Sequence, residues 1–186
     1  MHRVLLGFFV CILPAAAFAQ VLFPQLPQPV TTFSFEDKDW KIEPTTRVKK
    51  APYHGPTPLT IAGARVIKTM ELKELLESTK DLVVIDVLDS KERKSVPGAF
   101  WMPGAGDGQF FGAEKSRFSA ALDKITEGNK SRPIVFLCSS SECWLSYNAS
   151  LHALESGYTD VIWYRGGTAA WSGASLVWKK PERVNW

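Results

Sequence analysis

Cys138 and Cys143 are the two residues whose type and spacing best suit covalent chemistry. A short apolar run at 134–137, rich in β-branched and aromatic residues, precedes Cys138 and predicts a strand buried on both faces. A helical pattern over 144–156 follows Cys143. A cysteine at the point where a parallel strand turns toward a helix lies where open α/β sheets bind ligands.

The loop between the two cysteines favours a thiolate. Backbone N–H groups of a tight loop entering a helix attract negative charge and lower the pKa of a cysteine placed there. Glu142 opposes this effect, because a carboxylate beside a thiolate disfavours ionisation. We take Cys138 and Cys143 as candidate catalytic residues and, as the candidate substrate-binding loop, Ser139, Ser140, Ser141, Glu142 and Trp144. The alternative is structural: a buried cysteine, or a stabilising disulfide.

The N-terminus predicts export. His2 and Arg3 form a short basic region, an apolar run covers 4–13, and Ala17-Phe18-Ala19 is a small-x-small cleavage signal. Residues 1–19 are therefore predicted to be a cleaved signal peptide, which would remove Cys11. The compartment would be oxidising, the periplasm in a Gram-negative bacterium, where paired cysteines persist as a disulfide.

The charge balance argues against two classes of partner. Removal of residues 1–19 takes away one basic residue and leaves 21 basic and 19 acidic residues. This balance does not suggest binding to nucleic acid or, after cleavage, to a membrane. Two cysteines without convergent histidines predict no metal site, and we expect no cofactor. We expect His152 to be a surface helix residue, and nothing places His54 near Cys138.

Two further regions complete the chain. Residues 20–60 are rich in proline and predict an extended arm on the domain, with partner docking as the alternative. Residues 61–186 alternate between strand and helix patterns, which predicts one α/β domain with a parallel sheet of about five strands flanked by helices. The expected strands are 64–67, 82–85, 100–102, 134–137 and 161–164. The expected helices are 70–78, 118–125, 144–156 and a short one around Ala170 and Trp171, with Thr69 and Thr168 as N-caps.

Several ordered motifs resemble the rhodanese-like fold. They are Val84-Ile85-Asp86-Val87, Val96-Pro97-Gly98-Ala99, the strand ending at Cys138, Gly157-Tyr158 with Val161, and Arg165-Gly166-Gly167 with Trp171. The resemblance covers roughly residues 62–180. It implies that Cys138 accepts sulfane sulfur as a persulfide and that the amides of residues 139–143 hold the terminal sulfur. Sulfurtransferases of this kind commonly carry a basic residue where this chain has Cys143, so we expect weak activity with thiosulfate.

A narrower resemblance concerns partners. Residues 143–149, with Trp163-Tyr164, resemble an exported rhodanese-like group that carries a cysteine–cysteine–tryptophan motif. That group is associated with alcohol catabolism dependent on pyrroloquinoline quinone. The resemblance implies a partner in a periplasmic quinoprotein alcohol dehydrogenase system.

Asp86 and Arg93 are the candidate supporting residues. Asp86 ends a predicted strand beside the site. Its carboxylate is either a cap for a helix or loop or a catalytic group. The basic residues of the next loop favour a solvated loop over an anion-attracting entrance to the site; they are Lys91, Arg93 and Lys94.

The sequence thus predicts an exported rhodanese-like protein whose redox-capable cysteine pair handles sulfane sulfur or exchanges thiols and disulfides through Cys138. It could be a sulfurtransferase or a persulfide carrier acting on a small sulfur- or thiol-containing substrate. The alternative is a non-catalytic accessory module with a structural Cys138–Cys143 disulfide.

Overall fold

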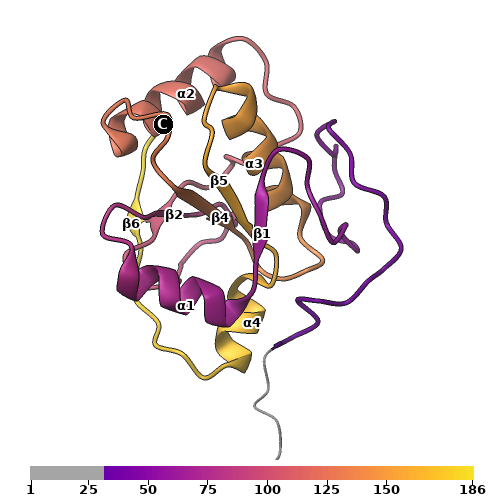
Figure 1. Ribbon diagram of the computed structural model, residues 1–186. Coiled ribbons are helices and arrows are strands. Elements are labelled where there is room, and N and C mark those ends of the chain that lie inside the picture. Colours follow the sequence, from indigo (N-terminus) through magenta and orange to yellow (C-terminus); the bar gives the residue numbers. More distant parts are fainter. Residues whose placement is uncertain (1–31) are drawn as a thin grey trace, which may run out of the picture.

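A parallel sheet organises the computed structural model, which describes residues 32–186 (Figure 1). The predicted signal peptide, Cys11 and residues 20–31 of the predicted arm lie outside the described residues. The sheet has six strands in the order β1-β5-β4-β2-β3-β6, and every neighbouring pair is parallel. The strands are β1 (Arg65–Ile67), β2 (Val83–Asp86), β3 (Phe100–Trp101), β4 (Ile134–Leu137), β5 (Val161–Tyr164) and β6 (Glu182–Arg183).

The helices form two layers, as expected for an α/β domain. They are α1 (Thr69–Ser78), α2 (Ala113–Thr126), α3 (Trp144–Glu155) and α4 (Gly167–Gly173). Helices α1 and α4 cover one face of the sheet, and α2 and α3 cover the other (Figure 1). Alternate residues of a strand enter opposite layers: Val83 and Ile85 pack with α2 and α3, whereas Val84 packs with α1 and α4. None of the helices within residues 32–186 is long and apolar enough to cross a membrane.

The parallel α/β fold is confirmed, with local corrections. The sheet has a sixth strand, β6, that we did not predict, because its two residues are exposed and charged and leave no apolar pattern. Helix α2 begins at Ala113, five residues before the predicted start. Neither predicted threonine is an N-cap: Lys68 caps α1 and Gly166 caps α4.

Residues 32–60 lie extended against the domain and contain no helix or strand. The Glu36 carboxylate accepts hydrogen bonds from the backbone N–H and the hydroxyl of Thr69, both at the start of α1. It thus satisfies one of the donors that a helix N-terminus leaves free. Burial raises the pKa of Glu36, and the bonds from Thr69 oppose that rise. The arm is therefore attached to the domain through backbone groups and buried polar contacts.

Candidate active site

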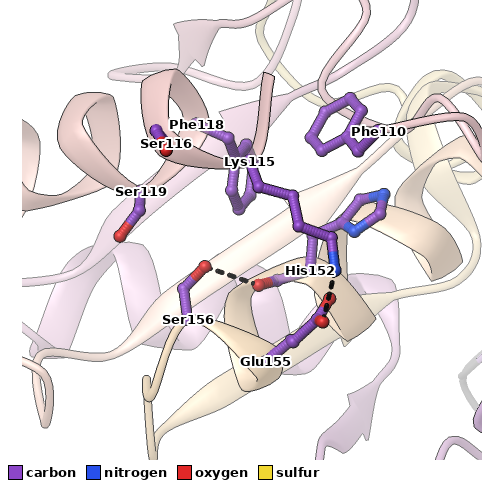
Figure 2. Close-up of a pocket in the computed structure, with 8 residues that line it drawn as sticks. All are labelled: Phe110, Lys115, Ser116, Phe118, Ser119, His152, Glu155 and Ser156. Carbon is purple, nitrogen blue, oxygen red and sulfur yellow. Dashed lines mark hydrogen bonds and ion pairs between the residues drawn. The ribbon is translucent and has the colours of Figure 1, made fainter. Parts of the chain in front are cut away.

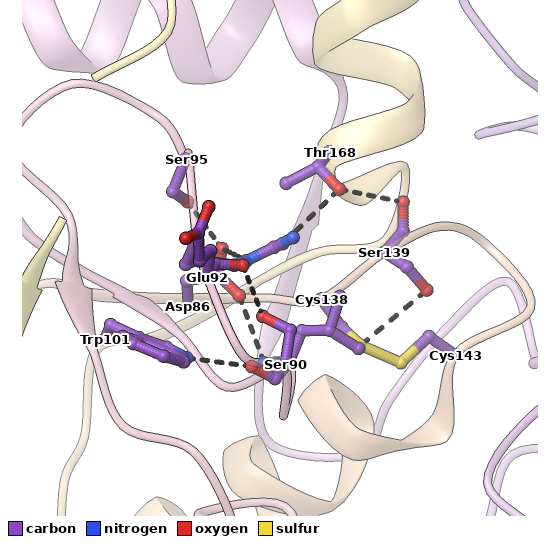
Figure 3. Close-up of polar contacts among 11 residues, drawn as sticks. Asp86, Ser90, Glu92, Ser95, Trp101, Cys138, Ser139, Cys143 and Thr168 are labelled. Atoms are coloured by element: carbon purple, nitrogen blue, oxygen red, sulfur yellow. Dashed lines mark hydrogen bonds and ion pairs between the residues drawn. A yellow bond between two sulfur atoms is a disulfide. The ribbon is translucent and has the colours of Figure 1, made fainter. Parts of the chain in front are cut away.

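Cys138 and Cys143 form a disulfide, with their Cα atoms 6.2 Å apart (Figure 3). Cys138 directly follows β4, and Cys143 is the N-cap of α3. The pair therefore lies at the carboxyl end of a central strand, where parallel sheets bind ligands. Both cysteines are buried, with exposed fractions of 1% and 5%. A reagent in solution thus has little direct access to either sulfur.

The start of α4 holds the first half of the cysteine loop. The backbone N–H of Thr168 donates to the Cys138 carbonyl at 2.9 Å, and that of Ala169 donates to the Ser139 carbonyl at 2.8 Å. Gly167 has a φ of 58°, and a Cβ there would lie 2.5 Å from the Cys138 carbonyl oxygen. Only glycine combines this backbone conformation with so close an approach. The Gly-Gly pair thus lets α4 contact the loop.

The loop amides partly fit the sulfur cradle that the resemblance implies. The Glu142 N–H donates to the Ser140 hydroxyl and the Cys143 N–H donates to the Ser140 carbonyl, so these two amides are occupied. Within residues 32–186, no acceptor meets the amides of Ser139, Ser140 or Ser141. Three adjacent free N–H groups can hold a negatively charged sulfur. Trp144, at the end of the loop, packs with its ring against Tyr147.

The arm runs alongside the second half of the same loop. Gly55 N–H donates to the Glu142 carbonyl at 2.8 Å, and the Thr57 hydroxyl donates to the Ser141 carbonyl at 2.6 Å. His54 and Cys143 form an antiparallel backbone bridge. His54, which the sequence did not place near the site, is thus a backbone neighbour of one cysteine. The Trp144 indole N–H donates to the Pro56 carbonyl. We call residues 53–57 the arm segment.

Arg165 holds the arm segment in place, a role that the sequence did not reveal. Its guanidinium is buried and donates to the Thr57 hydroxyl and carbonyl and to three further arm carbonyls, those of Phe35, Glu36 and Lys38. All five acceptors are uncharged, and desolvation lowers the pKa of Arg165. The Arg-Gly-Gly motif marked this position, but four of its five acceptors are backbone oxygens, which no sequence pattern indicates.

Asp86, which Figure 3 shows near Cys138, forms an ion pair with Arg93. Asp86 is fully buried and accepts hydrogen bonds from Arg93 Nε at 2.7 Å and from the Ser95 hydroxyl at 2.6 Å. It also accepts one from the Leu88 N–H, as a loop-capping carboxylate does. Burial raises the pKa of Asp86, and the charge of Arg93 opposes that rise. Asp86 contacts neither sulfur, so it is a positioning residue.

Arg93 connects this carboxylate to the cysteine loop. Its Nη2 lies 3.4 Å from the Thr168 hydroxyl, which in turn donates to the Ser139 carbonyl. The Arg93 side chain is 10% exposed, so the prediction of a solvated side chain is wrong for this residue. Lys91 and Lys94 are exposed, as predicted. The loop after β2 thus contributes one buried cation and two exposed ones.

His152 does not belong to the cysteine site, and its predicted surface position is wrong. It is 4% exposed, its ring stacks on Phe110 at 4.2 Å, and its Nε2 bonds the Asp107 carbonyl. Burial lowers its pKa. His152 lines a separate cavity of about 280 Å³. Figure 2 shows it there beside Lys115 and Glu155. Within residues 32–186, no group of three or more histidine, cysteine or acidic side chains is placed to bind a metal ion.

This fold and site define a class of protein. Residues 69–174, more than half of the chain, match the rhodanese-like domain family. The chain belongs to the rhodanese-like family. No curated protein shows a significant match to the sequence.

Solved structures with this fold include three bacterial proteins. A thiosulfate sulfurtransferase from Pseudomonas aeruginosa is 19% identical, with a TM-score of 0.50, over 66% of this chain and 22% of that one. The rhodanese-like domain of an Anabaena protein is 23% identical, with a TM-score of 0.48, over 64% and 80%. A polysulfide-sulfur transferase homodimer from Wolinella succinogenes is 18% identical, with a TM-score of 0.46, over 63% and 80%. This chain thus spans about a fifth of the Pseudomonas protein's length.

Proposed function

We propose that this protein is an exported thiol–disulfide protein that takes up sulfane sulfur on Cys138 and releases it by forming the Cys138–Cys143 disulfide. The observation that carries the proposal is the disulfide itself, which joins the residue at the end of β4 to the N-cap of α3. In the rhodanese-like family this loop holds the sulfur-accepting cysteine. A second cysteine within bonding distance adds a resolving thiol.

The proposed cycle balances in atoms and electrons. In the dithiol state, the Cys138 thiolate attacks the outer sulfur of a persulfide donor and becomes a persulfide, and the donor leaves as a thiolate. The Cys143 thiolate then attacks the Cys138 sulfur, which forms the disulfide and expels sulfide. The dithiol supplies the two electrons that reduce sulfane sulfur to sulfide. A thiol reductant of the compartment restores the dithiol by two successive exchanges.

The loop chemistry favours this cycle over thiosulfate transfer. No lysine or arginine lies between residues 138 and 144. The Glu142 carboxylate repels a dianion in the same loop. The free amides of Ser139, Ser140 and Ser141 suit a singly charged persulfide sulfur. Persulfides and polysulfides are therefore the preferred donor class.

Single cysteine variants test the proposal. Reduced Cys143→Ser should trap a persulfide on Cys138 after exposure to a persulfide donor, seen by mass spectrometry as one added sulfur, and should release no sulfide. Wild type should release sulfide and return to the disulfide. Cys138→Ser is the matched control and should neither add sulfur nor release sulfide. The proposal fails if Cys143→Ser stays unmodified, or if Cys138→Ser takes up the sulfur.

The accessory role is a second candidate, supported by burial. With both cysteines buried, the disulfide could close the loop between β4 and α3 as a structural bond. The protein would then serve a periplasmic quinoprotein alcohol dehydrogenase system through its surface. Resistance of the folded protein's disulfide to small reductants would favour this role. N-terminal analysis of secreted protein tests export itself, with Gln20 as the expected first residue.

A further inference from the structure

A groove rich in basic residues lies at the carboxyl ends of β2 and β3. Its volume is about 730 Å³. Three segments line it: the loop after β2, the end of β3 and the chain around β6. We define this basic groove as Lys91, Arg93, Lys94, Trp101, Lys180 and Arg183. The cysteine site as described above uses only one of these residues, Arg93.

Positive charge is concentrated in the basic groove. Five basic residues and one carboxylate, that of Glu92, line it, a formal charge of +4, whereas the full chain carries +3. Arg93 is neutralised by Asp86. Within residues 32–186, no carboxylate lies within 4.0 Å of the charged nitrogens of the other four basic residues, namely Lys91, Lys94, Lys180 and Arg183. Four unpaired cations on one surface attract anions.

Trp101 and Arg183 stack against each other in the floor of the basic groove. The guanidinium of Arg183 lies 4.7 Å from the centre of the Trp101 ring. The Trp101 indole N–H donates to the Leu88 carbonyl, which fixes the ring against the loop after β2. A stacked guanidinium has its donor atoms free at the edge for a carboxylate. Arg183 is thus held where it can bind one end of an anionic ligand.

The sheet register gives the backbone distance from Trp101, in the floor of the basic groove, to the strand that leads into Cys138. Trp101 pairs with Asp86, and Asp86 pairs with Leu137, which precedes Cys138. Neighbouring strands lie about 4.8 Å apart, so Trp101 and Leu137 are roughly 10 Å apart along one edge of the sheet. Arg93 belongs to both sites, because it lines the groove and also contacts Thr168. The basic groove and the cysteine loop can therefore contact two ends of one molecule.

From this placement we propose that the basic groove binds the carboxylates of a small thiol or persulfide whose sulfur reaches the Cys138–Cys143 pair. A span of roughly 10 Å corresponds to about three extended residues, so the compound has the length of a tripeptide. Burial of both cysteine residues favours a small compound over a protein surface, because the thiol of a folded protein reaches a buried disulfide less readily than a small thiol does. This inference rests on the proposed thiol–disulfide function and names the substrate class of that site.

The reaction is two thiol–disulfide exchanges. A thiolate bound by its carboxylates attacks the Cys138 sulfur, forms a mixed disulfide and releases the Cys143 thiolate. A second molecule of the thiol attacks the mixed disulfide, leaves as its own disulfide and restores the dithiol. A persulfide bound in the same way donates its outer sulfur to the Cys138 thiolate.

Glutathione and its ethyl esters provide a matched test on the oxidised mature protein. Glutathione has two carboxylates, whereas the diethyl ester keeps the length and the thiol but loses both charges. Glutathione should open the disulfide about tenfold faster than the diethyl ester at low ionic strength, with the monoethyl ester between them. The difference should shrink in 0.5 M salt, on the order of a 4 Å screening length.

A double variant tests whether the basic groove is responsible. Lys180→Gln with Arg183→Gln should lose most of the discrimination between glutathione and its diethyl ester. Lys80→Gln with Lys124→Gln is the control, because it removes the same charge from exposed positions that precede β2 and β4, near the amino ends of the strands. This control variant should keep the discrimination between glutathione and its diethyl ester. Equal rates for glutathione and its esters in wild type, or unchanged discrimination in the groove variant, would overturn the inference.

A binding measurement separates this inference from the proposed function. S-Methylglutathione cannot react but keeps both carboxylates. Its calorimetric binding should be about tenfold weaker to the Lys180→Gln, Arg183→Gln variant than to wild type. If it binds in this way while no thiol opens the disulfide, the basic groove stands and the proposed function fails. If thiols open the disulfide without any preference for carboxylates, the proposed function stands and the basic groove inference fails.

Discussion

The cysteine loop has two neighbours of very different character. On one side, the arm segment contacts it through backbone hydrogen bonds and the buried hydroxyl of Thr57. On the other side lie Arg93, Thr168 and the basic groove, with exposed lysines. The arm side thus provides donors for the carbonyls of Ser141 and Glu142 in the loop. The basic side can attract a charged substrate, so we expect charged substrates to approach from there, whereas the arm limits the approach of neutral thiols from its own side.

The largest effect should come from breaking the arm side at its anchor. Arg165→Met removes the donor of five hydrogen bonds to the arm, three of them buried. We expect a loss of about 3 kcal/mol or more in the free energy of unfolding, because unsatisfied buried acceptors are costly. Opening of the disulfide by a neutral thiol should become faster. Urea denaturation and thiol-release kinetics measure the two effects.

Arg47→Met is the matched control for the anchor, because Arg47 lies exposed on the same arm. Arg47→Met should change neither the free energy of unfolding nor the rate at which a neutral thiol opens the disulfide. If Arg165→Met unfolds at the same urea concentration as wild type, the arm does not depend on this residue. If it is destabilised but its disulfide opens no faster, the arm stabilises the fold without controlling access.

The next effect should come from the basic side. Arg93→Met removes the cation that pairs with buried Asp86, which should cost about 2 kcal/mol near neutral pH. Without Arg93 the folded-state pKa of Asp86 rises further above its unfolded value. A raised folded-state pKa gives stability that is present at low pH and lost as pH rises through it. The destabilisation relative to wild type should therefore shrink as pH falls towards the usual range of aspartate.

Two controls isolate the Arg93 effect. Lys94→Met removes a neighbouring exposed charge and should leave stability within about 0.5 kcal/mol of wild type. Asp86→Asn combined with Arg93→Met should abolish the added pH dependence. Stability curves from pH 4 to pH 8 that stay parallel for Arg93→Met and wild type would contradict the pairing.

The sequence predicted the central fold well, for a clear physical reason. Strands β4 and β5 have the predicted bounds, because each is a four-residue apolar run buried on both faces. Their alternation with helices gave the parallel sheet. β6 could not be predicted, because its strand conformation depends on pairing with β3 and on no preference of its own two residues. The placement of Cys138 at the end of β4 followed from the same apolar run.

The surroundings of the cysteines were only partly predictable. Cys138, Cys143 and their loop stood out through residue type and spacing. The arm segment did not, because all five of its residues contact the loop through backbone groups, whose positions leave no mark on the sequence. Arg165 was noticed as part of a motif, yet its role depends on the path of an arm more than a hundred residues away. His152 was misplaced because its burial comes from Phe110, which lies in a loop.

A smaller change on the arm side would sharpen the comparison. Thr57→Val keeps the shape of a buried side chain but removes its hydrogen bonds to Ser141 and Arg165. We expect a loss of about 1–2 kcal/mol and a modest acceleration of disulfide opening by neutral thiols. Thr60→Val, at an exposed arm position, is the control. Equal opening rates in the two variants would show that the arm acts only through Arg165.

The smallest expected effect concerns the charge within the loop itself. Glu142→Gln removes the carboxylate that repels an anionic donor. Two unit charges about 4 Å apart in water interact with an energy of roughly 1 kcal/mol. In a Cys143→Ser background, where Cys138 stays free, the variant should transfer sulfur from thiosulfate to cyanide about threefold to tenfold faster. Replacing Cys143 by arginine beside Glu142→Gln should raise the rate further.

Glu43→Gln is the control, because Glu43 is an exposed carboxylate on the arm, and it should leave the rate of sulfur transfer unchanged. Since the repulsion is electrostatic, the gain should diminish at high salt. A gain that persists unchanged at high salt would instead point to altered loop geometry, and no gain at all would mean that Glu142 faces away from the donor.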